Sequence, residues 1–124
     1  MIKRYKVLRL NYKMMRVIPE ENEILRKAGA DIIKINGDKI LPENLDVDAL
    51  MVISAKVPGE VINKLSKCRI IARMGIGIDK IDVKVATDNG IIVTNVPDFC
   101  SSELAAHNLY VILSAPLPLK NIWA

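Results

Sequence analysis

The residues best suited to chemistry lie in a glycine turn that follows an apolar segment. Residues 68–72 are mostly apolar, Arg73 comes next, and the turn contains Gly75, Ile76 and Gly77. A buried parallel strand that ends in such a turn presents backbone N–H groups at the carboxyl edge of its sheet. These groups suit the capture of a small anion such as a carboxylate. The sequence therefore predicts an anion-binding site at this turn.

Two structural alternatives remain for the same residues. Arg73 can form an ion pair with Asp79 or Asp82 rather than contact a ligand. The two glycines can also form a tight turn between a strand and a helix with nothing bound. The structural and the ligand-binding interpretations are both retained.

The histidine and cysteine positions give no support to a catalytic dyad or a metal site. His107, the only histidine, lies in an apolar stretch with Glu103 as its one carboxylate neighbour at helical spacing, so we expect it to be structural. Cys68 and Cys100 lack the spacing of metal ligands and of a disulfide framework. We therefore expect no catalytic residue, no metal ion and a reducing, cytoplasmic location.

Length and composition limit the protein to one domain. The chain has 124 residues, of which 51% are hydrophobic and 4% aromatic, so it can form one aliphatic core. The low aromatic content argues against nucleic-acid binding, and no apolar run is long enough to span a membrane. The formal net charge is +4. We attribute the N-terminal basic cluster to the solvated flanks of a strand; it comprises Lys3, Arg4, Lys6, Arg9, Lys13 and Arg16.

Strand and helix signals alternate along the chain. Apolar runs without strict alternation are typical of strands that are covered on both faces of a parallel sheet. Five such strands with short helical crossovers predict an α/β fold, namely a flavodoxin-like, doubly wound parallel sheet in a three-layer α/β/α arrangement. The expected strands are residues 5–10, 31–35, 49–53, 68–72 and 91–94.

Proline and glycine positions indicate where the helices begin and end. Pro19 opens a helix that ends before Gly29, and Pro58 opens a helix that runs through Leu65. Residues 36–48 form a polar connection with a possible helical turn. We expect a short helix between the glycine turn and Gly90, so that the turn connects a strand to a helix.

The last helix is expected to begin at Ser101 and to reach residue 115. Between Leu104 and Ala115 it is apolar on nearly every side, so one sheet face cannot cover it. We expect this stretch to mediate a homodimer or a domain-swapped oligomer. Residues 116–124 form an atypical tail whose prolines stop the helix, and they give the impression of a chain cut short.

Three motifs in register resemble the D-isomer-specific 2-hydroxyacid dehydrogenases. Residues 73–82 fit Arg-x-Gly-x-Gly-x-Asp-x-Ile-Asp, residues 93–97 fit Val-x-Asn-x-Pro, and residues 105–107 fit Ala-x-His. The resemblance covers the N-terminal, substrate-binding half of that family. It implies that residues 1–100 form a substrate-binding domain and that residues 101–115 form an interdomain or dimerisation helix.

The resemblance also implies roles for the residues of the turn. In the family, backbone N–H groups of the glycine turn hold the substrate carboxylate, and Ile76 and Gly77 stand at those positions. Gly75 would permit the close approach of the substrate. In some members a basic side chain before the turn also meets the substrate, and Arg73 matches it.

Other family positions match less completely. Ser54 and Ala55 correspond to residues that line the same cleft, and Ser101 corresponds to a residue beside the nicotinamide end of the cofactor. Ile53 stands where the phosphoglycerate enzymes carry arginine, which argues against phosphoglycerate as substrate. The family's NAD-binding domain, with its Gly-x-Gly-x-x-Gly motif and catalytic arginine, glutamate and histidine, has no counterpart here.

Two functions are therefore expected as alternatives. The first is the substrate-binding half of an NAD-dependent D-2-hydroxyacid dehydrogenase, inactive alone and without tight NAD binding of its own. Its ligand would be a small 2-keto or 2-hydroxy acid. The second is a non-catalytic module that binds a small anion or dimerises, similar to the corepressor branch of the family.

Overall fold

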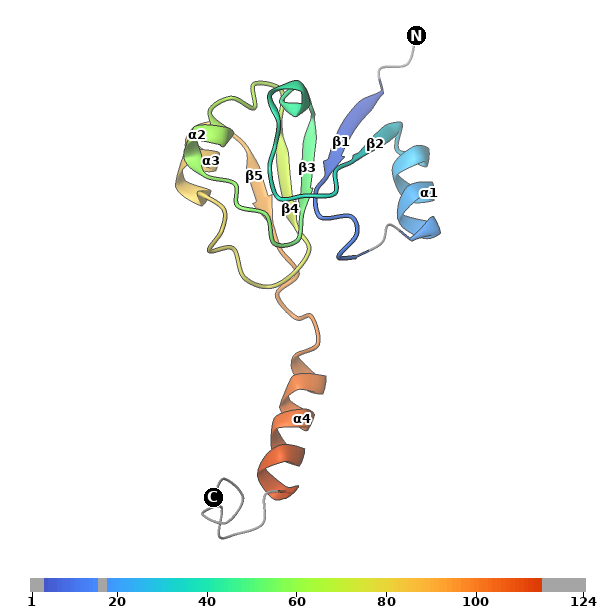
Figure 1. The fold of residues 1–124 in the computed structure, drawn as a ribbon, viewed down its shortest axis with the longest axis vertical. Coiled ribbons are helices and arrows are strands. Elements are labelled where there is room, and N and C mark those ends of the chain that lie inside the picture. Colours follow the sequence, from blue (N-terminus) through green and yellow to red (C-terminus); the bar gives the residue numbers. More distant parts are fainter. Residues whose placement is uncertain (1–3, 16–17, 115–124) are drawn as a thin grey trace.

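A five-stranded parallel sheet forms the centre of the protein (Figure 1). The structure is a computed structural model that describes residues 4–15 and 18–114. The strand order is β2-β1-β3-β4-β5, which is that of a flavodoxin-like doubly wound sheet. All five predicted strands are confirmed, each within two residues of its expected bounds. They are β1 (Tyr5–Arg9), β2 (Ala30–Lys34), β3 (Ala49–Val52), β4 (Ile70–Arg73) and β5 (Ile92–Thr94).

Helices and one 3-10 turn follow the strands, as expected from the alternating pattern. They are α1 (Pro19–Lys27), η1 (Pro42–Asn44), α2 (Gly59–Ile62), α3 (Val83–Asp88) and α4 (Ser101–Ser114). The helix expected to reach Leu65 is shorter, because the Leu65 N–H donates to the carbonyl of Ile62, three residues earlier, in a tight turn. Gly29, after α1, has a φ of 76°, the left-handed conformation that ends many helices.

The main core lies on the sheet face covered by α2 and α3. Paired residues of parallel strands point to the same face, and Leu8, Leu50 and Ile71 are such a row across β1, β3 and β4. All three are fully buried. Ile62 of α2 and Ala86 of α3 belong to the same buried cluster. This aliphatic core fixes the loops at the carboxyl edge of the sheet.

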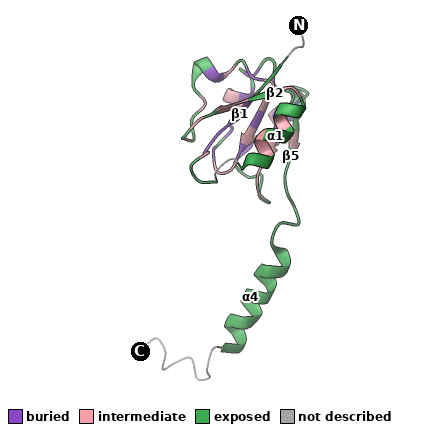
Figure 2. Cartoon of the chain, turned by 90° about the vertical axis from the view of Figure 1, so that its right-hand side faces the viewer, coloured by how far each residue is buried: buried purple, intermediate pink, exposed green. Residues whose placement is uncertain are grey.

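The opposite sheet face is covered over only part of its width. There α1 packs beside β1 and β2, and Glu21 of α1 forms an ion pair with Arg9 of β1 at 3.2 Å. No described helix lies over β4 and β5 on this side, and burial decreases toward β5 (Figure 2). We call this uncovered area the open face; it consists of Ile70, Ala72, Ile92 and Thr94.

The prediction of a solvated basic strand is wrong for Arg9. Its side chain has 0% exposure, because β1 is an interior strand and α1 covers it. The Nη2 group of Arg9 donates to the Met15 carbonyl at 3.1 Å, whereas Nε and Nη1 have no hydrogen-bond partner among the described residues. The expectation holds for Arg4 and Lys6, whose side chains are about half exposed.

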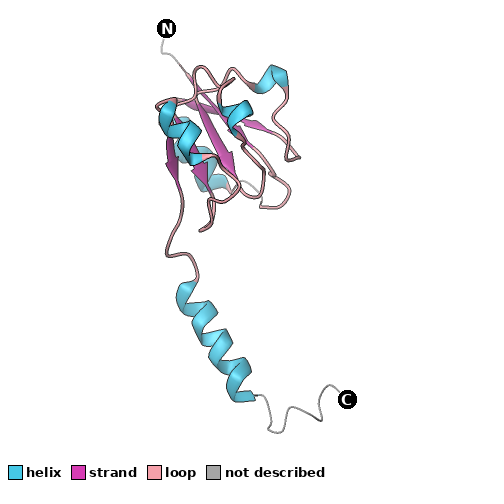
Figure 3. Cartoon of the chain, turned by 90° about the vertical axis from the view of Figure 1, so that its left-hand side faces the viewer, coloured by secondary structure: helices cyan, strands magenta, loops and turns pink. Residues whose placement is uncertain are grey.

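The helix α4 extends away from the sheet, beyond its carboxyl edge (Figures 1 and 3). None of its residues is buried. His107 is therefore exposed in the described chain, and its expected structural, non-catalytic role stays a prediction. The predicted tail at residues 116–124 lies outside the described residues. Among the described helices, none is long and apolar enough to cross a membrane.

Candidate functional site

The glycine turn is held in place by the segment that leaves β5. The Val96 N–H donates to the carbonyl of Gly75 at 3.0 Å. The Asn95 side-chain amide donates to the carbonyl of Ile76 at 2.9 Å. Two successive carbonyls of the turn therefore face the same neighbouring segment.

This arrangement directs two backbone N–H groups the other way. In a trans peptide the C=O of one residue and the N–H of the next point in opposite directions. The N–H groups of Ile76 and Gly77 thus point away from the segment at residues 95–96. No described residue accepts a hydrogen bond from either group, and Ile76 is 47% exposed. The turn consequently offers two adjacent free donors to solvent, which is the geometry expected of an anion site.

Arg73 lies beside this turn. The guanidinium covers the Cα of Gly75 so closely that a Cβ atom there would lie 2.9 Å from the Cζ of Arg73. Within the described part of the chain, Arg73 makes no ion pair with a carboxylate. Asp82, one of the partners considered for it, instead accepts a hydrogen bond from the Val85 N–H and caps α3. The cation is therefore available near the free amides.

A pocket of about 310 Å³ opens beside Arg73. Ala72 and Thr94 place it on the open face, at the carboxyl ends of β4 and β5. Its lining is largely apolar and consists of Met15, Ala72, Arg73, Met74, Gly75, Thr94, Asn95, Val96 and Phe99. Ile76 and Gly77 are not among the residues that line this pocket.

Ser54 and Ala55 are organised by a residue that the sequence analysis missed. The Oδ1 atom of Asn11 accepts hydrogen bonds from the Ser54 N–H at 3.3 Å and from the Ala55 N–H at 3.1 Å. Ala55 is buried. The N–H groups at positions 54 and 55 are thus occupied, and only the Ser54 hydroxyl, which contacts the Met14 sulfur at 3.3 Å, faces outward.

Asn11 joins three loops at the carboxyl edge of the sheet. Besides its contacts after β3, its side-chain amide donates to the Gly37 carbonyl at 3.2 Å and to the Asp38 carboxylate, both after β2. Its own backbone has a φ of 56°, a left-handed conformation that asparagine tolerates better than most residues. An asparagine directly after an apolar strand was the available signal.

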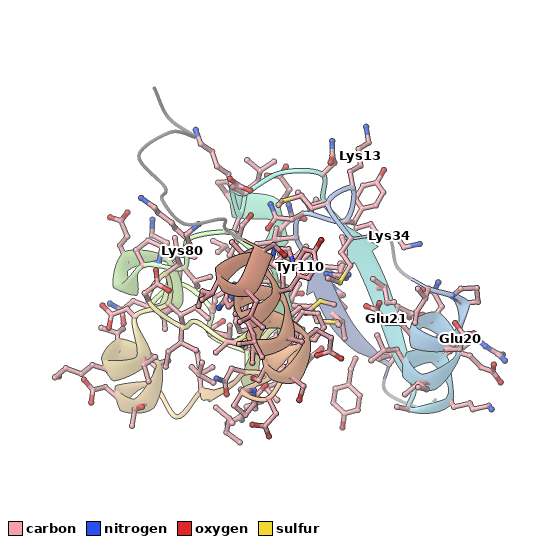
Figure 4. All side chains as sticks on the ribbon, turned by 90° about the horizontal axis from the view of Figure 1, so that it is seen from below. Lys13, Glu20, Glu21, Lys34, Lys80 and Tyr110 are labelled. Carbon is pink, nitrogen blue, oxygen red and sulfur yellow. The ribbon has the colours of Figure 1, made fainter. Side chains whose placement is uncertain are left out.

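Ser54 lies in a second groove, apart from the pocket beside Arg73. The Lys80 ammonium donates to the Ser54 carbonyl at 3.1 Å, and both residues line a groove of about 450 Å³ that also includes Lys56 and Val61. In the view from below, Lys80 and Glu21 of α1 lie on opposite sides of α4 (Figure 4). Ser101 is exposed at the start of α4. The structure thus brings Arg73 to the glycine turn and leaves Ser54 and Ser101 in separate surroundings.

Neither cysteine takes part in this site. Cys68 is buried and Cys100 is exposed, and both are free thiols. Burial raises the pKa of the Cys68 thiol, which keeps it neutral in the core. Among the described residues there is no group of three or more histidine, cysteine or acidic side chains that could hold a metal ion.

The fold and the turn together define a class of protein. It is a doubly wound α/β domain that presents free backbone amides and an arginine at the carboxyl edge of its sheet. The sequence profile of the D-isomer specific 2-hydroxyacid dehydrogenase catalytic domain matches residues 11–110. The chain belongs to this family, as its motifs predicted.

Relatives of known activity match most of the chain. The D-3-phosphoglycerate dehydrogenase of Methanocaldococcus jannaschii is 35% identical over 107 residues, which are 86% of this chain and 20% of that protein. The glyoxylate reductase of Pyrococcus furiosus is 35% identical over 106 residues, which are 80% of this chain and 32% of that protein. The chain therefore spans a fifth to a third of the length of these relatives.

Solved structures of the family share the fold. A D-lactate dehydrogenase from Aquifex aeolicus, complexed with NAD and lactic acid, matches 94% of this chain and 35% of that chain with a TM-score of 0.74 and 25% identity. An NADPH-dependent glyoxylate/hydroxypyruvate reductase from Sinorhizobium meliloti, in complex with NADP and malonate, matches 98% of this chain and 38% of that chain with a TM-score of 0.70 and 25% identity.

Proposed function

We propose that this chain is the substrate-binding domain of an NAD-dependent D-2-hydroxyacid dehydrogenase. Its ligand is a small 2-keto or 2-hydroxy acid, whose carboxylate binds the free N–H groups of Ile76 and Gly77. The observation that supports this proposal is the pair of carbonyls at residues 75 and 76, which are held by the β5 exit and so turn the next two amides outward. A cytoplasmic location remains a prediction.

Arg73 supplies the positive charge in this proposal. A carboxylate held by two neutral N–H groups is bound more strongly when a guanidinium lies nearby. Arg73 has no carboxylate partner in the described chain and lies against the turn. It therefore helps to fix the carboxylate and, through it, the position of the reacting C2 carbon. Gly75 allows the guanidinium to remain there.

The dinucleotide does not fit the described residues. A pyrophosphate binds at a helix N-terminus that follows a glycine-rich turn. Here the N-terminus of α3 is capped by the Asp82 carboxylate, which would repel phosphate. We assign only substrate binding to this chain, with no catalytic residue, and place the hydride chemistry of the proposed dehydrogenase in its cofactor domain. Ser101 would face that domain.

The experiment is a titration of the isotope-labelled chain, followed by the amide NMR signals. Pyruvate, glyoxylate and hydroxypyruvate are added separately, with acetamide as an uncharged control. We expect saturable shifts of the Ile76 and Gly77 amides with at least one acid and none with acetamide. The amide of Gly37, on another loop, serves as the internal reference. If every acid leaves both turn amides unmoved, the proposal is rejected.

A second function is favoured by the exposure of α4. None of the 14 residues of this helix is buried, so its apolar side chains are exposed to water, which is unfavourable. We propose that the chain self-associates through the stretch between Leu104 and Ala115, of which residues 104–114 are described. Such an interaction module is independent of substrate binding. Sedimentation velocity tests it: a chain that stays monomeric over a wide concentration range contradicts the proposal.

A further inference from the structure

Three lysines share one groove at the carboxyl edge of the sheet. This groove, of about 450 Å³, is lined by Lys39, Lys56 and Lys80, and we call it the lysine groove. Among the described residues that line it, Asp38 alone is acidic, and its carboxylate accepts a hydrogen bond from the Asn11 amide. Within the described part of the chain, none of the three ammonium groups forms an ion pair.

Basic residues at the opposite, amino edge of the sheet are paired instead. The Arg4 guanidinium forms an ion pair with Asp31, and the Lys6 ammonium forms one with Asp46. Lysines that lie together without such a partner repel one another. An anionic ligand in the lysine groove would offset this repulsion, whereas the amino edge needs no ligand to balance its charges.

The backbone holds Lys56 and Lys80 next to each other. A parallel β-bridge joins Val57 to Ile81, in which the Val57 N–H donates to the Lys80 carbonyl at 2.8 Å. The Asp82 N–H donates to the Val57 carbonyl at 3.1 Å on the other side of the bridge. Val57 and Ile81 are buried, whereas the two lysines that precede them are exposed and line the same groove. The bridge therefore presents two positive charges side by side.

One contact sets the direction of the Lys80 side chain. Its ammonium donates to the Ser54 carbonyl at 3.1 Å, next to the exit of β3. A lysine ammonium has three N–H groups, so two remain for a ligand. Asp79 and Asp82 line a neighbouring hollow together with Lys56 and Lys80, but neither carboxylate forms an ion pair with these lysines in the described chain.

The free amides of the glycine turn face the same side as Lys80. In the sheet, β4 lies between β3 and β5. Two carbonyls of the turn face the exit of β5, so the N–H groups of Ile76 and Gly77 face the side of β3, where the Lys80 ammonium lies. Gly77 and Lys80 are three residues apart, a span of at most about 11 Å. A hydrogen bond across residues 78–81 shortens this segment further.

We propose that the ligand is a 2-keto dicarboxylate, and that Lys56 and Lys80 bind its second carboxylate while the first lies on the turn amides. This inference rests on the proposed carboxylate site at the turn and adds the chemical class of the substrate. Ammonium groups hold a carboxylate through charge-assisted hydrogen bonds. Leu41 and Val61 line the same groove and offer apolar surface to the carbon chain between the two carboxylates.

The surrounding charges favour a carboxylate over a phosphate as the second group. Counted over the lysine groove and the neighbouring hollow, three lysines face three aspartates. These surroundings carry no surplus of positive charge to balance a phosphate dianion. A singly charged group placed directly between the two ammonium groups requires no such surplus, because it gains from the nearest charges most strongly.

The first experiment compares 2-oxoglutarate with 2-oxopentanoate, which has the same carbon chain without the second carboxylate. Each is titrated into the isotope-labelled chain and followed by the amide signals of Ile76 and Gly77. We expect 2-oxoglutarate to bind about tenfold more tightly, in line with the gain of charged hydrogen bonds. Added salt should reduce this difference, because the lysines are exposed.

Substitutions then assign the difference to the lysine pair. Lys56→Met and Lys80→Met should each weaken the binding of 2-oxoglutarate toward that of 2-oxopentanoate, whose own affinity should stay the same. Lys56→Met is the cleaner variant, because Lys80→Met also removes the hydrogen bond to Ser54. Lys34→Met is the control. It removes the same charge from the end of β2, and in the view from below Lys34 and Lys80 lie on opposite sides of α4 (Figure 4).

Four outcomes overturn the inference. Equal affinities of the two keto acids would reject the dicarboxylate and leave the proposed function intact. A preference for 2-oxoglutarate that survives both lysine substitutions would do the same. Tighter binding of 3-phosphonooxypyruvate than of 2-oxoglutarate would show that the second group is a phosphate. If neither keto acid moves the Ile76 and Gly77 amides, the proposed carboxylate site at the turn fails, and this inference fails with it.

Discussion

The guanidinium of Arg73 occupies the space above Gly75 that a side chain would need. A Cβ atom at position 75 would lie 2.9 Å from the Cζ of Arg73 and would contact Nη1 even more closely. The neighbour is the end of a flexible side chain, so it can move at little cost. Glycine at this position thus determines where the positive charge lies rather than whether the chain folds.

We predict that Gly75→Ala weakens keto-acid binding about tenfold, in line with the loss of one charged contact, roughly 1.5 kcal/mol. The free energy of unfolding should change by less than about 0.5 kcal/mol, since Gly75 needs no left-handed backbone. The amide titration and urea denaturation measure the two effects. Gly37→Ala is the control, because a Cβ there meets nothing within 4 Å. Unchanged binding in Gly75→Ala would contradict the role of Arg73.

Asn11 gives a second prediction, because it holds the loop at residues 54–55. Asn11→Ala removes four side-chain hydrogen bonds and places alanine at a φ of 56°. We expect a loss of about 3 kcal/mol in the free energy of unfolding. The Ser54 and Ala55 amides should exchange with solvent much faster, because both lose their acceptor. Denaturation and hydrogen exchange provide the measurements.

Two further variants separate the backbone from the side chain. Asn11→Gly keeps the left-handed conformation and loses only the hydrogen bonds, so it should be more stable than Asn11→Ala by about 1 kcal/mol. Asn11→Asp keeps an acceptor for the Ser54 and Ala55 amides but faces the Asp38 carboxylate. It should therefore be less stable than the wild type. Equal stability of all three variants would show that Asn11 does not join the loops.

The sequence predicted the sheet well because burial on both faces leaves a clear pattern. The runs around β3 and β4 are almost entirely apolar, and each is bounded by polar residues or glycine. The glycine turn was found from the same pattern. Arg9 was misassigned because its burial depends on Glu21 of α1, a partner from a separate element that no local pattern reveals. Asn11 was missed for the same reason, since its hydrogen bonds reach residues 37 and 54, far along the chain.

Hydrogen bonds from cationic side chains lower the pKa of two exposed carboxyl groups. The Arg4 guanidinium, whose Nε lies 2.7 Å from the carboxylate, lowers the pKa of Asp31 below its usual range. Hydrogen bonds from Lys67 and, next, Lys6 lower the pKa of Asp46. When the pKa of a carboxyl group is lower in the folded than in the unfolded chain, the group stabilises the fold at any pH above its unfolded pKa, about 3.9. This stabilisation is lost as the pH falls through the pKa of the folded chain.

We therefore predict that both carboxyl groups titrate below pH 3.9 in the folded chain, as followed by carbon NMR of the side chains. Arg4→Met should return the pKa of Asp31 to its ordinary value and leave that of Asp46 unchanged. Lys67→Met should raise the pKa of Asp46 only partway toward its ordinary value, because the hydrogen bond from Lys6 remains, and should leave that of Asp31 unchanged. Both side chains are about half exposed, so added salt should reduce each shift. Shifts that resist salt and either substitution would assign them to another cause.

The ion pair between Arg9 and Glu21 gives the last prediction. Arg9 is fully buried and the Glu21 side chain is 16% exposed, so removal of the carboxylate leaves a buried charge without its partner. We expect Glu21→Ala to lower the free energy of unfolding by about 3 kcal/mol. Glu23→Ala is the matched control on the same helix, because its pair with Lys27 is exposed and is worth only about 0.5 kcal/mol.

The double variant Arg9→Met, Glu21→Leu completes the test. It replaces both charges by apolar side chains of similar size, which in a buried site is often neutral or stabilising. Two of the Arg9 nitrogens have no hydrogen-bond partner in the described part of the chain, so their removal relieves a desolvation cost there. Urea denaturation should thus place the double variant at or above the wild type, even though Glu21→Ala alone lies well below it. If Glu21→Ala costs no more than Glu23→Ala, Arg9 is hydrated in solution and α1 does not cover it.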